Sequence, residues 1–485
     1  MIKTPRLVKS VLSTFVTQII SWVLTFSVML YLPRYVGAAG LGKLAFASSF
    51  IAIFGAVVPL GTSKVLIRDI ARDRNRTGEL LLSALILRIP LALVMTVIAI
   101  SAVRLLGYPE ITRTLVAFMA LGMVTATAND ALASALQGQE KLPRQSVAVL
   151  VEKFLFSALT IVLVIFRAPL WTLAMVGLFT STVSLCVNLT AFAPLFSTLR
   201  WPTRTTVRYV VAAGMPFVGW IIFQTLYGQT DPIILSFVTN DMTVGWYAVA
   251  FRLICTTLVL PGALTTALFP TLSRLHKDDL EAFQILARRM LSLVLLCGIP
   301  IALLFICQPD RLIALMHYPK EFTGGIPVLR VGGVGVFLYF AAAVLGTTVI
   351  ASDRQAKMFY SSLIATVVGI PACFICSYIT HIFWKNGAIG AMFSDVAIEA
   401  YLVLSYLQMV PLGTFNKKTL WLLGRSLLAS LPFAVLLVAT AKGTWGLWIL
   451  IPATAIYMLM CWALNCFDPE FLELARKLFV RRAKV

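Results

Sequence analysis

The chain has 485 residues, of which 60% are hydrophobic and 12% are charged, and its mean hydropathy is +0.92. A soluble domain carries about 25% charged residues, so this composition excludes a protein with an ordinary solvated surface. The net charge of +20 is spread over short segments between apolar runs, so it gives no reason to expect a nucleic-acid partner. We expect an all-α polytopic membrane protein whose basic segments attract anionic lipids.

Apolar runs of about twenty residues, the length that spans a bilayer, recur along the whole chain. We expect about 14 transmembrane helices, near residues 10–32, 43–63, 81–105, 114–136, 146–166, 170–195, 209–238, 246–271, 289–308, 325–350, 357–380, 386–409, 420–441 and 444–466. The basic segments between them fall on one side of the membrane, so the positive-inside rule predicts that both termini are cytoplasmic.

The connection between the first two expected helices has a shorter copy later in the chain. Residues 32–47 read LPRYVGAAGLGKLAFA, and residues 244–250 read VGWYAVA. This repetition indicates a duplicated half, although chance similarity between Gly/Ala-rich helices is the alternative. We expect two six-helix lobes related by pseudo-two-fold symmetry, with two extra helices. The predicted parts are an N-terminal lobe, a C-terminal lobe, helices 13–14 and a basic cytoplasmic tail, at 1–208, 209–415, 416–466 and 467–485.

Two pairs of opposite charges lie inside apolar runs, where an ionisable group costs about 2.5–3.5 kcal/mol on insertion scales. Arg88 and Asp130 lie at similar depths from the cytoplasmic side, and Asp231 and Arg252 lie at similar depths from the outer side. We predict that each pair meets and stabilises a gate, cytoplasmic for the first pair and external for the second. The alternative is that each pair only neutralises charge between packed helices.

The seventh expected helix carries a polar and aromatic stripe. Trp220, Gln224, Tyr227 and Asp231 follow one another at steps of four, three and four residues, which places them on one helical face. Because amides and carboxylates are costly in hydrocarbon, we expect this face to line a cavity. Hydrogen bonding between helices is the other explanation. The following Pro232 predicts a kink.

Asp395 and Glu399 lie four residues apart in the twelfth expected helix and so share a face near mid-membrane. Two close carboxylates can carry a proton or bind a sodium ion, since repulsion between them raises one pKa. Salt bridges to a neighbouring helix are the alternative. We expect no metal site, because Cys373-x-x-Cys376 lies in an apolar helix with no histidine nearby. H⁺ or Na⁺ as a coupling ion is therefore the one cofactor considered.

Several motifs, in the same order along the chain, resemble those of one family. Residues 32–42 are similar to the first loop of the polysaccharide-transport flippases, and LIRDIAR at 66–72 is similar to their basic turn after helix 2, with Asp69 where Glu is commoner. VGWYAVAFRL at 244–253, LFPTLSR at 268–274 and NGAIGA at 386–391 resemble their later helices. The chain is thus identified as resembling the lipid-linked oligosaccharide flippases of the multidrug/oligosaccharidyl-lipid/polysaccharide exporter (MATE-like) superfamily.

The resemblance implies two lobes around a central cavity, alternating access, and no catalytic residue. The expected cargo is a polyprenyl-pyrophosphate-linked oligosaccharide, the repeat unit of an O-antigen or exopolysaccharide. Its diphosphate requires cations, best as arginine, and the sugars require aromatic faces and amides. From depth and chemistry, the diphosphate candidates are Arg34, Arg88, Lys153, Arg252 and Arg330. The glycan candidates are Trp220, Gln224 and Tyr227.

Three other functions stay open. A cation-coupled multidrug exporter of the same superfamily would favour a more acidic cavity, and a lipid II-type peptidoglycan-precursor flippase shares the architecture and the diphosphate. A membrane glycosyltransferase or polymerase would usually need a large external or acidic loop, and neither is visible in the sequence. We expect the bacterial cytoplasmic (inner) membrane, with polysaccharide polymerase or chain-length machinery as possible partners.

Overall fold

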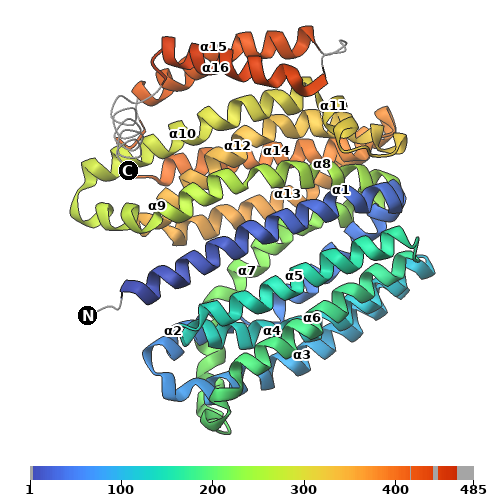
Figure 1. Ribbon diagram of the computed structural model, residues 1–485, viewed down its shortest axis with the longest axis vertical. Helices are drawn as coiled ribbons and strands as arrows, with labels where there is room; N and C mark the ends of the chain where they lie inside the picture. Colours follow the sequence, from blue (N-terminus) through green and yellow to red (C-terminus); the bar gives the residue numbers. More distant parts are fainter. Residues whose placement is uncertain (1–3, 416, 441–445, 467–485) are drawn as a thin grey trace. The chain divides into compact units, whose positions relative to one another are not determined.

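The computed structural model describes residues 4–415, 417–440 and 446–466, and in this part of the chain every regular element is a helix. The chain divides into two compact units, Met1–Gly245 and Trp246–Val485 (Figure 1). Each helix satisfies its own backbone hydrogen bonds. A membrane-spanning segment must do so, because the hydrocarbon core of a bilayer holds no water to bond these groups.

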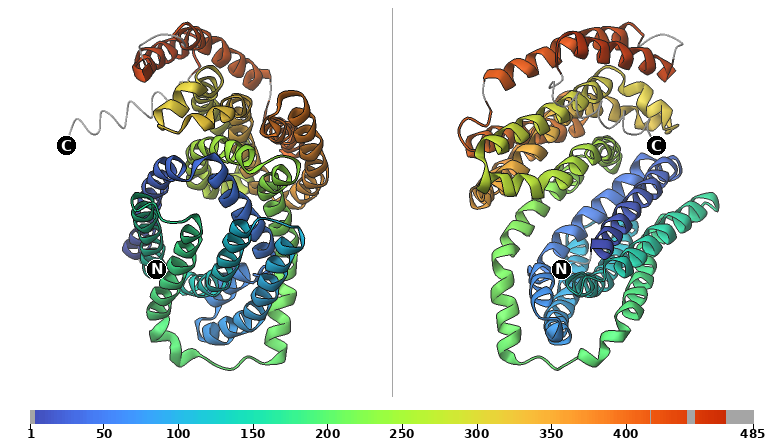
Figure 2. Two further views of the ribbon diagram at one scale, coloured as in Figure 1. Left: turned by 90° about the vertical axis from the view of Figure 1, so that its right-hand side faces the viewer. Right: turned by 60° about the vertical axis from the view of Figure 1, so that its left-hand side comes forward.

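The first unit is a bundle in which α4 packs on α3 and α6, while α1 packs on α5 and α7. Figure 2 shows the segment between α6 and α7 crossing the end of this unit. Its elements are α1 (Thr4–Val57), α2 (Thr62–Arg72), η1 (Arg74–Arg76), α3 (Thr77–Leu105), α4 (Glu110–Gly138), α5 (Leu142–Ile165), α6 (Leu170–Phe192), η2 (Ala193–Thr198), α7 (Arg204–Val238) and the start of α8 (Asp241–Thr257).

In the second unit α12 packs against α10 and α14, and α13 lies along α14. The pair α15 and α16 packs on α10, where Tyr457 donates a hydrogen bond to the Leu296 carbonyl at 2.8 Å. After α8 the elements are α9 (Val259–Asp278), α10 (Leu280–Cys307), α11 (Pro309–Leu315), η3 (Lys320–Gly324), α12 (Gly325–Ala351), α13 (Gln355–Trp384), α14 (Gly387–Met409), α15 (Lys417–Ala439), η4 (Gly446–Ile449) and α16 (Leu450–Ala463).

Eleven helices in the described ranges are long and apolar enough to cross a membrane. The label α1 covers two helices joined at Gly37, whose φ of 69° lies in the region that favours glycine. Counting α1 as two, and adding the bent α7 and the shorter α16, gives the fourteen helices expected from the sequence. The all-α polytopic architecture is confirmed.

The bend of the seventh helix differs from the sequence expectation. Its segments Arg204–Gly219 and Ile221–Val238 meet at 43°, so the bend is closer to Pro216 than to Pro232. The helix α7 packs on α1, α2 and α3, and the compact first unit accordingly extends to Gly245. The lobes defined by the internal repeat, with a boundary at 208/209, stay a prediction, and the basic tail at 467–485 lies outside the described residues.

The two copies of the repeated motif touch within the first unit. A Cβ built on Gly42 of α1 would collide with the carbonyl oxygen of Asp241, and a Cβ on Gly245 would collide with the carbonyl oxygen of Ala38. Lys43 lies 3.8 Å from the Asp241 carboxylate beside this contact. The glycines of the motif therefore allow two backbones to approach each other as no other residue would.

Replacing Gly245 by alanine is expected to lower the free energy of unfolding by about 1–3 kcal/mol, because the added methyl group meets backbone that cannot move aside cheaply. The matched control is Gly228→Ala on α7, where no atom lies within 4 Å of the added Cβ. The control should be unchanged or up to about 1 kcal/mol more stable, since alanine favours the helix. Unfolding of the purified protein in detergent measures both, and equal effects would contradict the close contact.

Candidate functional site

Among the charged residues of the first unit whose burial the structure describes, Arg88 on α3 is the most enclosed, and its side chain has no exposed surface. Its Nε donates to Thr62 Oγ1 at 2.7 Å, Nη1 to Asp130 Oδ2 at 2.8 Å, and Nη2 to Ser63 Oγ at 2.8 Å. Ser63 in turn donates to the same Asp130 oxygen at 2.6 Å. A buried guanidinium needs several such partners to offset its lost hydration, and α2 and α4 supply them.

The sequence predicts that Arg88 meets Asp130, and the structure contains this ion pair. The two partners differ in accessibility: half of the Asp130 side-chain surface is exposed, whereas Arg88 is sealed. In this structure the pair therefore offers a carboxylate to its surroundings rather than a cation. This arrangement favours a role for Arg88 in holding α2, α3 and α4 together over direct contact with an anionic ligand.

A line of small polar side chains joins α4 to α6. Thr125 and Ser181 share a hydrogen bond of 2.6 Å, and Asn129 donates to Ser184 at 2.9 Å. Asn188 donates to the Asn129 side-chain oxygen at 2.7 Å. Sequence reasoning missed this line, because serine, threonine and asparagine are common in membrane helices and their spacing within one helix does not identify the partner helix. These bonds stabilise the helix pair next to Asp130.

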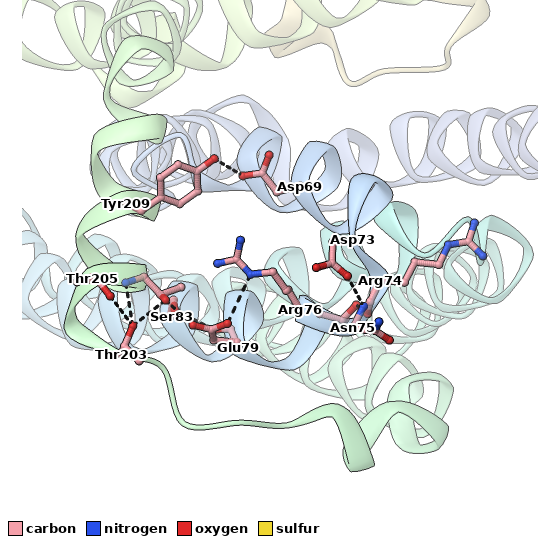
Figure 3. Close-up of polar contacts among 12 residues, drawn as sticks. Asp69, Asp73, Arg74, Asn75, Arg76, Glu79, Ser83, Thr203, Thr205 and Tyr209 are labelled. Atoms are coloured by element: carbon pink, nitrogen blue, oxygen red, sulfur yellow. Dashed lines mark hydrogen bonds and ion pairs between the residues drawn. The ribbon is translucent and has the colours of Figure 1, made fainter.

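Charged side chains also gather where α2 and α3 meet the start of α7 (Figure 3). Asp69 accepts from Arg68 Nε at 2.7 Å and from the Tyr209 hydroxyl at 2.8 Å. Glu79 accepts a hydrogen bond from Thr206 and lies 3.6 Å from Arg76. Asp69 of α2 and Glu79 of α3 thus hold the beginning of α7 against these two helices.

Burial raises the pKa of Asp69, but hydrogen bonds from Arg68 and Tyr209 outweigh it and hold the pKa below its ordinary value of 3.8. The ionised form is therefore the one that the fold prefers. A carboxyl group with a depressed folded-state pKa contributes stability above its unfolded pKa, and that stability is lost as the pH falls through the folded value.

Asp69→Asn is accordingly expected to lower the free energy of unfolding at pH 7 by about 1–2 kcal/mol, through loss of charge-assisted hydrogen bonds. The difference from the wild type should shrink as the pH falls below about 3.8. Asp73→Asn serves as a control, because the new amide oxygen still accepts from the Asn75 amide of η1. Detergent unfolding curves between pH 3 and pH 7 test this, and a difference independent of pH would contradict it.

In the second unit two carboxylates lie buried on α14. Asp395 and Glu399 are 8% and 5% exposed, and Tyr247 of α8 donates its hydroxyl to Asp395 Oδ2 at 2.7 Å. The ring of Tyr247 stacks on Phe251 with centroids 5.5 Å apart. The structure thus brings together a tyrosine of the repeated motif and one of the two acids considered for ion coupling.

The remaining predicted cations lie in different settings. Arg34 lies over the Tyr31 ring at 5.3 Å, and Lys153 on α5 is exposed. Arg330 donates from Nε to the Ile306 carbonyl at 3.1 Å and lies 3.7 Å from Asp310. Arg252 is exposed on α8, and the described residues of the second unit give its guanidinium neither a hydrogen bond nor an ion pair.

The polar stripe of α7 is only partly described. Gln224 is exposed, Tyr227 is half-buried and Asp231 is 7% exposed. On the opposite face of α7, Gln229 accepts a hydrogen bond of 2.9 Å from Ser49 of α1. The Trp220 side chain lies outside the described residues. Asp231 belongs to the first unit and Arg252 to the second, so their pairing stays a prediction.

Comparisons with known proteins agree with this helical architecture. A family model described as "Polysaccharide biosynthesis protein" matches residues 7–276, and one described as "MatE" matches residues 216–375. No curated protein matches the sequence.

Among solved structures, the lipid II flippase MurJ in an inward closed conformation has a TM-score of 0.71 at 15% identity, over 93% of this chain and 98% of that one. An inward-facing multidrug resistance MATE family transporter of the MOP superfamily has a TM-score of 0.64 at 15% identity, over 79% and 93%. The eukaryotic MATE transporter AtDTX14 has a TM-score of 0.52 at 16% identity, over 84% and 93%. At these identities the likeness establishes the fold.

Proposed function

Since this chain belongs to the polysaccharide biosynthesis protein family and has the multi-pass fold of MATE transporters and of MurJ, we propose that it is a flippase for a polyprenyl-pyrophosphate-linked oligosaccharide. The observation that carries the proposal is the family match, which spans more than half of the chain. The cargo moves from the inner to the outer leaflet of the bacterial cytoplasmic membrane by alternating access, and no covalent bond changes.

Arg252 is the strongest candidate for contact with the diphosphate. A guanidinium that faced acyl chains would cost about 2.5–3.5 kcal/mol, so an exposed arginine on a membrane helix calls for water or an anion beside it. Its planar fork matches two phosphate oxygens. Arg34, Lys153 and Arg330 are secondary candidates for this contact. Arg330 ranks below Arg252 because its guanidinium already has Asp310 and the Ile306 carbonyl as partners.

The exposed Gln224 and half-buried Tyr227 on α7 are the candidates for contact with the glycan. An aromatic face covers the apolar side of a sugar ring, and an amide both donates to and accepts from its hydroxyl groups. Asp231 and Arg88–Asp130 are proposed to stabilise closed states rather than to hold cargo, because Asp231 and Arg88 are buried.

Deletion of the gene in its own organism tests the proposal. The lipid-linked oligosaccharide should accumulate in the inner leaflet, and the full-length chain should restore its export to the outer leaflet. Accumulation of a peptidoglycan precursor instead would assign the lipid II-type cargo, which the MurJ-like fold also suits. Normal export of both lipids together with loss of drug resistance would point to a multidrug exporter.

We also propose that Asp395 and Glu399 couple transport to H⁺ or Na⁺. Two buried acids one helical turn apart can share one proton or one ion. Glu399→Gln should abolish the response of transport in proteoliposomes to an imposed ion gradient, while Asp310→Asn, at an exposed carboxylate, should keep it. A full gradient response in Glu399→Gln would contradict the coupling.

A further inference from the structure

A cavity of about 400 Å³ lies within the second unit, where α9 and α12 end side by side. Three of its residues recur at every fourth position of α9 and therefore share one helical face. The opposite wall is the end of α12 and the turn that follows it. The lining residues are Phe269, Ser273, Arg274, Lys277, Ile350, Ala351 and Asp353.

The rim of this cavity carries two cations and one acid. Arg274 and Lys277 are exposed, and in the described part of the second unit neither is engaged in an ion pair or a side-chain hydrogen bond. Asp353 is exposed on the other wall and makes no ion pair with either of them within 4 Å. Its φ of 58° belongs to the left-handed region, which few residues other than glycine adopt.

The lining of the cavity is amphipathic. It combines the apolar side chains Phe269 and Ile350 with the charged groups Arg274, Lys277 and Asp353, which follow them along the chain. The helices α9 and α12 terminate membrane spans, Asp241–Asp278 and Lys320–Ala351. Residues at the ends of such spans lie at the level of the lipid headgroups. Apolar and charged side chains that line one cavity at this level suit an amphipathic ligand better than a free ion.

We propose that this cavity binds the phosphodiester headgroup of a membrane lipid. The phosphate lies between Arg274 and Lys277, which donate charge-assisted hydrogen bonds to its oxygens. Asp353 accepts a hydrogen bond from a headgroup hydroxyl or ammonium group. The acyl chains leave past Phe269 and Ile350 into the bilayer. The site lies within one unit and does not depend on the identity of the transported cargo.

Binding of phosphatidylglycerol to the full-length protein in a neutral detergent tests the site, because the micelle then has no surface charge of its own. We expect saturable binding of one lipid molecule, with phosphatidylcholine, whose head has no donor, bound more weakly. Arg274→Gln/Lys277→Gln should raise the dissociation constant at least about tenfold. Glycerophosphoglycerol, the soluble phosphodiester that corresponds to this headgroup, should not compete at equal concentration.

The matched control is Arg204→Gln/Arg208→Gln, which removes two exposed charges from the start of α7, outside this cavity. It should change the dissociation constant by less than about twofold. A second variant, Ser273→Leu, narrows the cavity without a change in charge and should also weaken binding. Equal losses in both double variants, or no saturable binding, would overturn the site, and competition by glycerophosphoglycerol would overturn its assignment to a lipid.

Discussion

Removal of Asp130 is expected to cost more stability than removal of Arg88, although the two form one ion pair. Asp130→Leu leaves a guanidinium with no exposed surface next to two hydroxyl groups and no counter-charge. An uncompensated buried charge typically costs about 3–5 kcal/mol. Arg88→Met leaves a carboxylate that is half exposed and can be hydrated, so the expected cost is about 1 kcal/mol.

The double variant Arg88→Met/Asp130→Leu should recover most of the loss seen in Asp130→Leu, since well-packed apolar residues often replace a buried pair at little cost. The free energies of unfolding of the wild type, the two single variants and the double variant, measured in mixed micelles, complete this double-mutant cycle. The control Arg104→Met, at an exposed position on the same helix, should be nearly neutral. A cost for Arg88→Met equal to that for Asp130→Leu would contradict the asymmetric burial.

Loss of Arg252 is expected to reduce transport by about 10²-fold at unchanged stability. A guanidinium that donates two charge-assisted hydrogen bonds to a diphosphate contributes about 3 kcal/mol to binding, and 1.4 kcal/mol corresponds to a factor of ten. Arg252→Lys should retain part of the rate, because a lysine keeps the charge but loses the fork. Transport of the lipid-linked oligosaccharide in proteoliposomes is the measurement.

Arg104→Ala is the matched control for Arg252, because Arg104 is also an exposed arginine on a membrane helix but is not among the diphosphate candidates. Its effect on transport should stay within about threefold, as expected where no cargo contact is lost. Equal rates for Arg252→Ala and the wild type would remove Arg252 from the binding site. A severe loss of folded protein in Arg252→Ala would show that the residue is structural.

The helical architecture was predictable because each membrane span must be a long apolar run, a signal that survives without any tertiary information. The meeting of Arg88 with Asp130 was also predictable, from depth alone, since helices joined by a short turn bring equal depths together. The sequence could not reveal Thr62 and Ser63 as partners of Arg88. They begin α2, which follows a turn after α1, and the direction of α2 after that turn depends on tertiary packing.

Other features depend on contacts that no local pattern encodes. The hydrogen bonds between α4 and α6 use serine, threonine and asparagine, which are common in membrane helices and become informative only when two faces are known to meet. The packing of α7 on α1, α2 and α3 likewise follows from side chains far apart in sequence. Tertiary packing also decides that Arg252 is exposed whereas Arg88 is buried, so the sequence alone did not distinguish these two arginines.

Flipping of the cargo can be followed after reconstitution of the purified full-length chain into vesicles that contain a polyprenyl-pyrophosphate-linked oligosaccharide. The fraction of oligosaccharide open to a membrane-impermeant lectin is followed with time. The wild type should speed exposure of the sugar, and Arg252→Ala should do so far less. Exposure at the rate of protein-free vesicles, from protein shown to be folded, would contradict it.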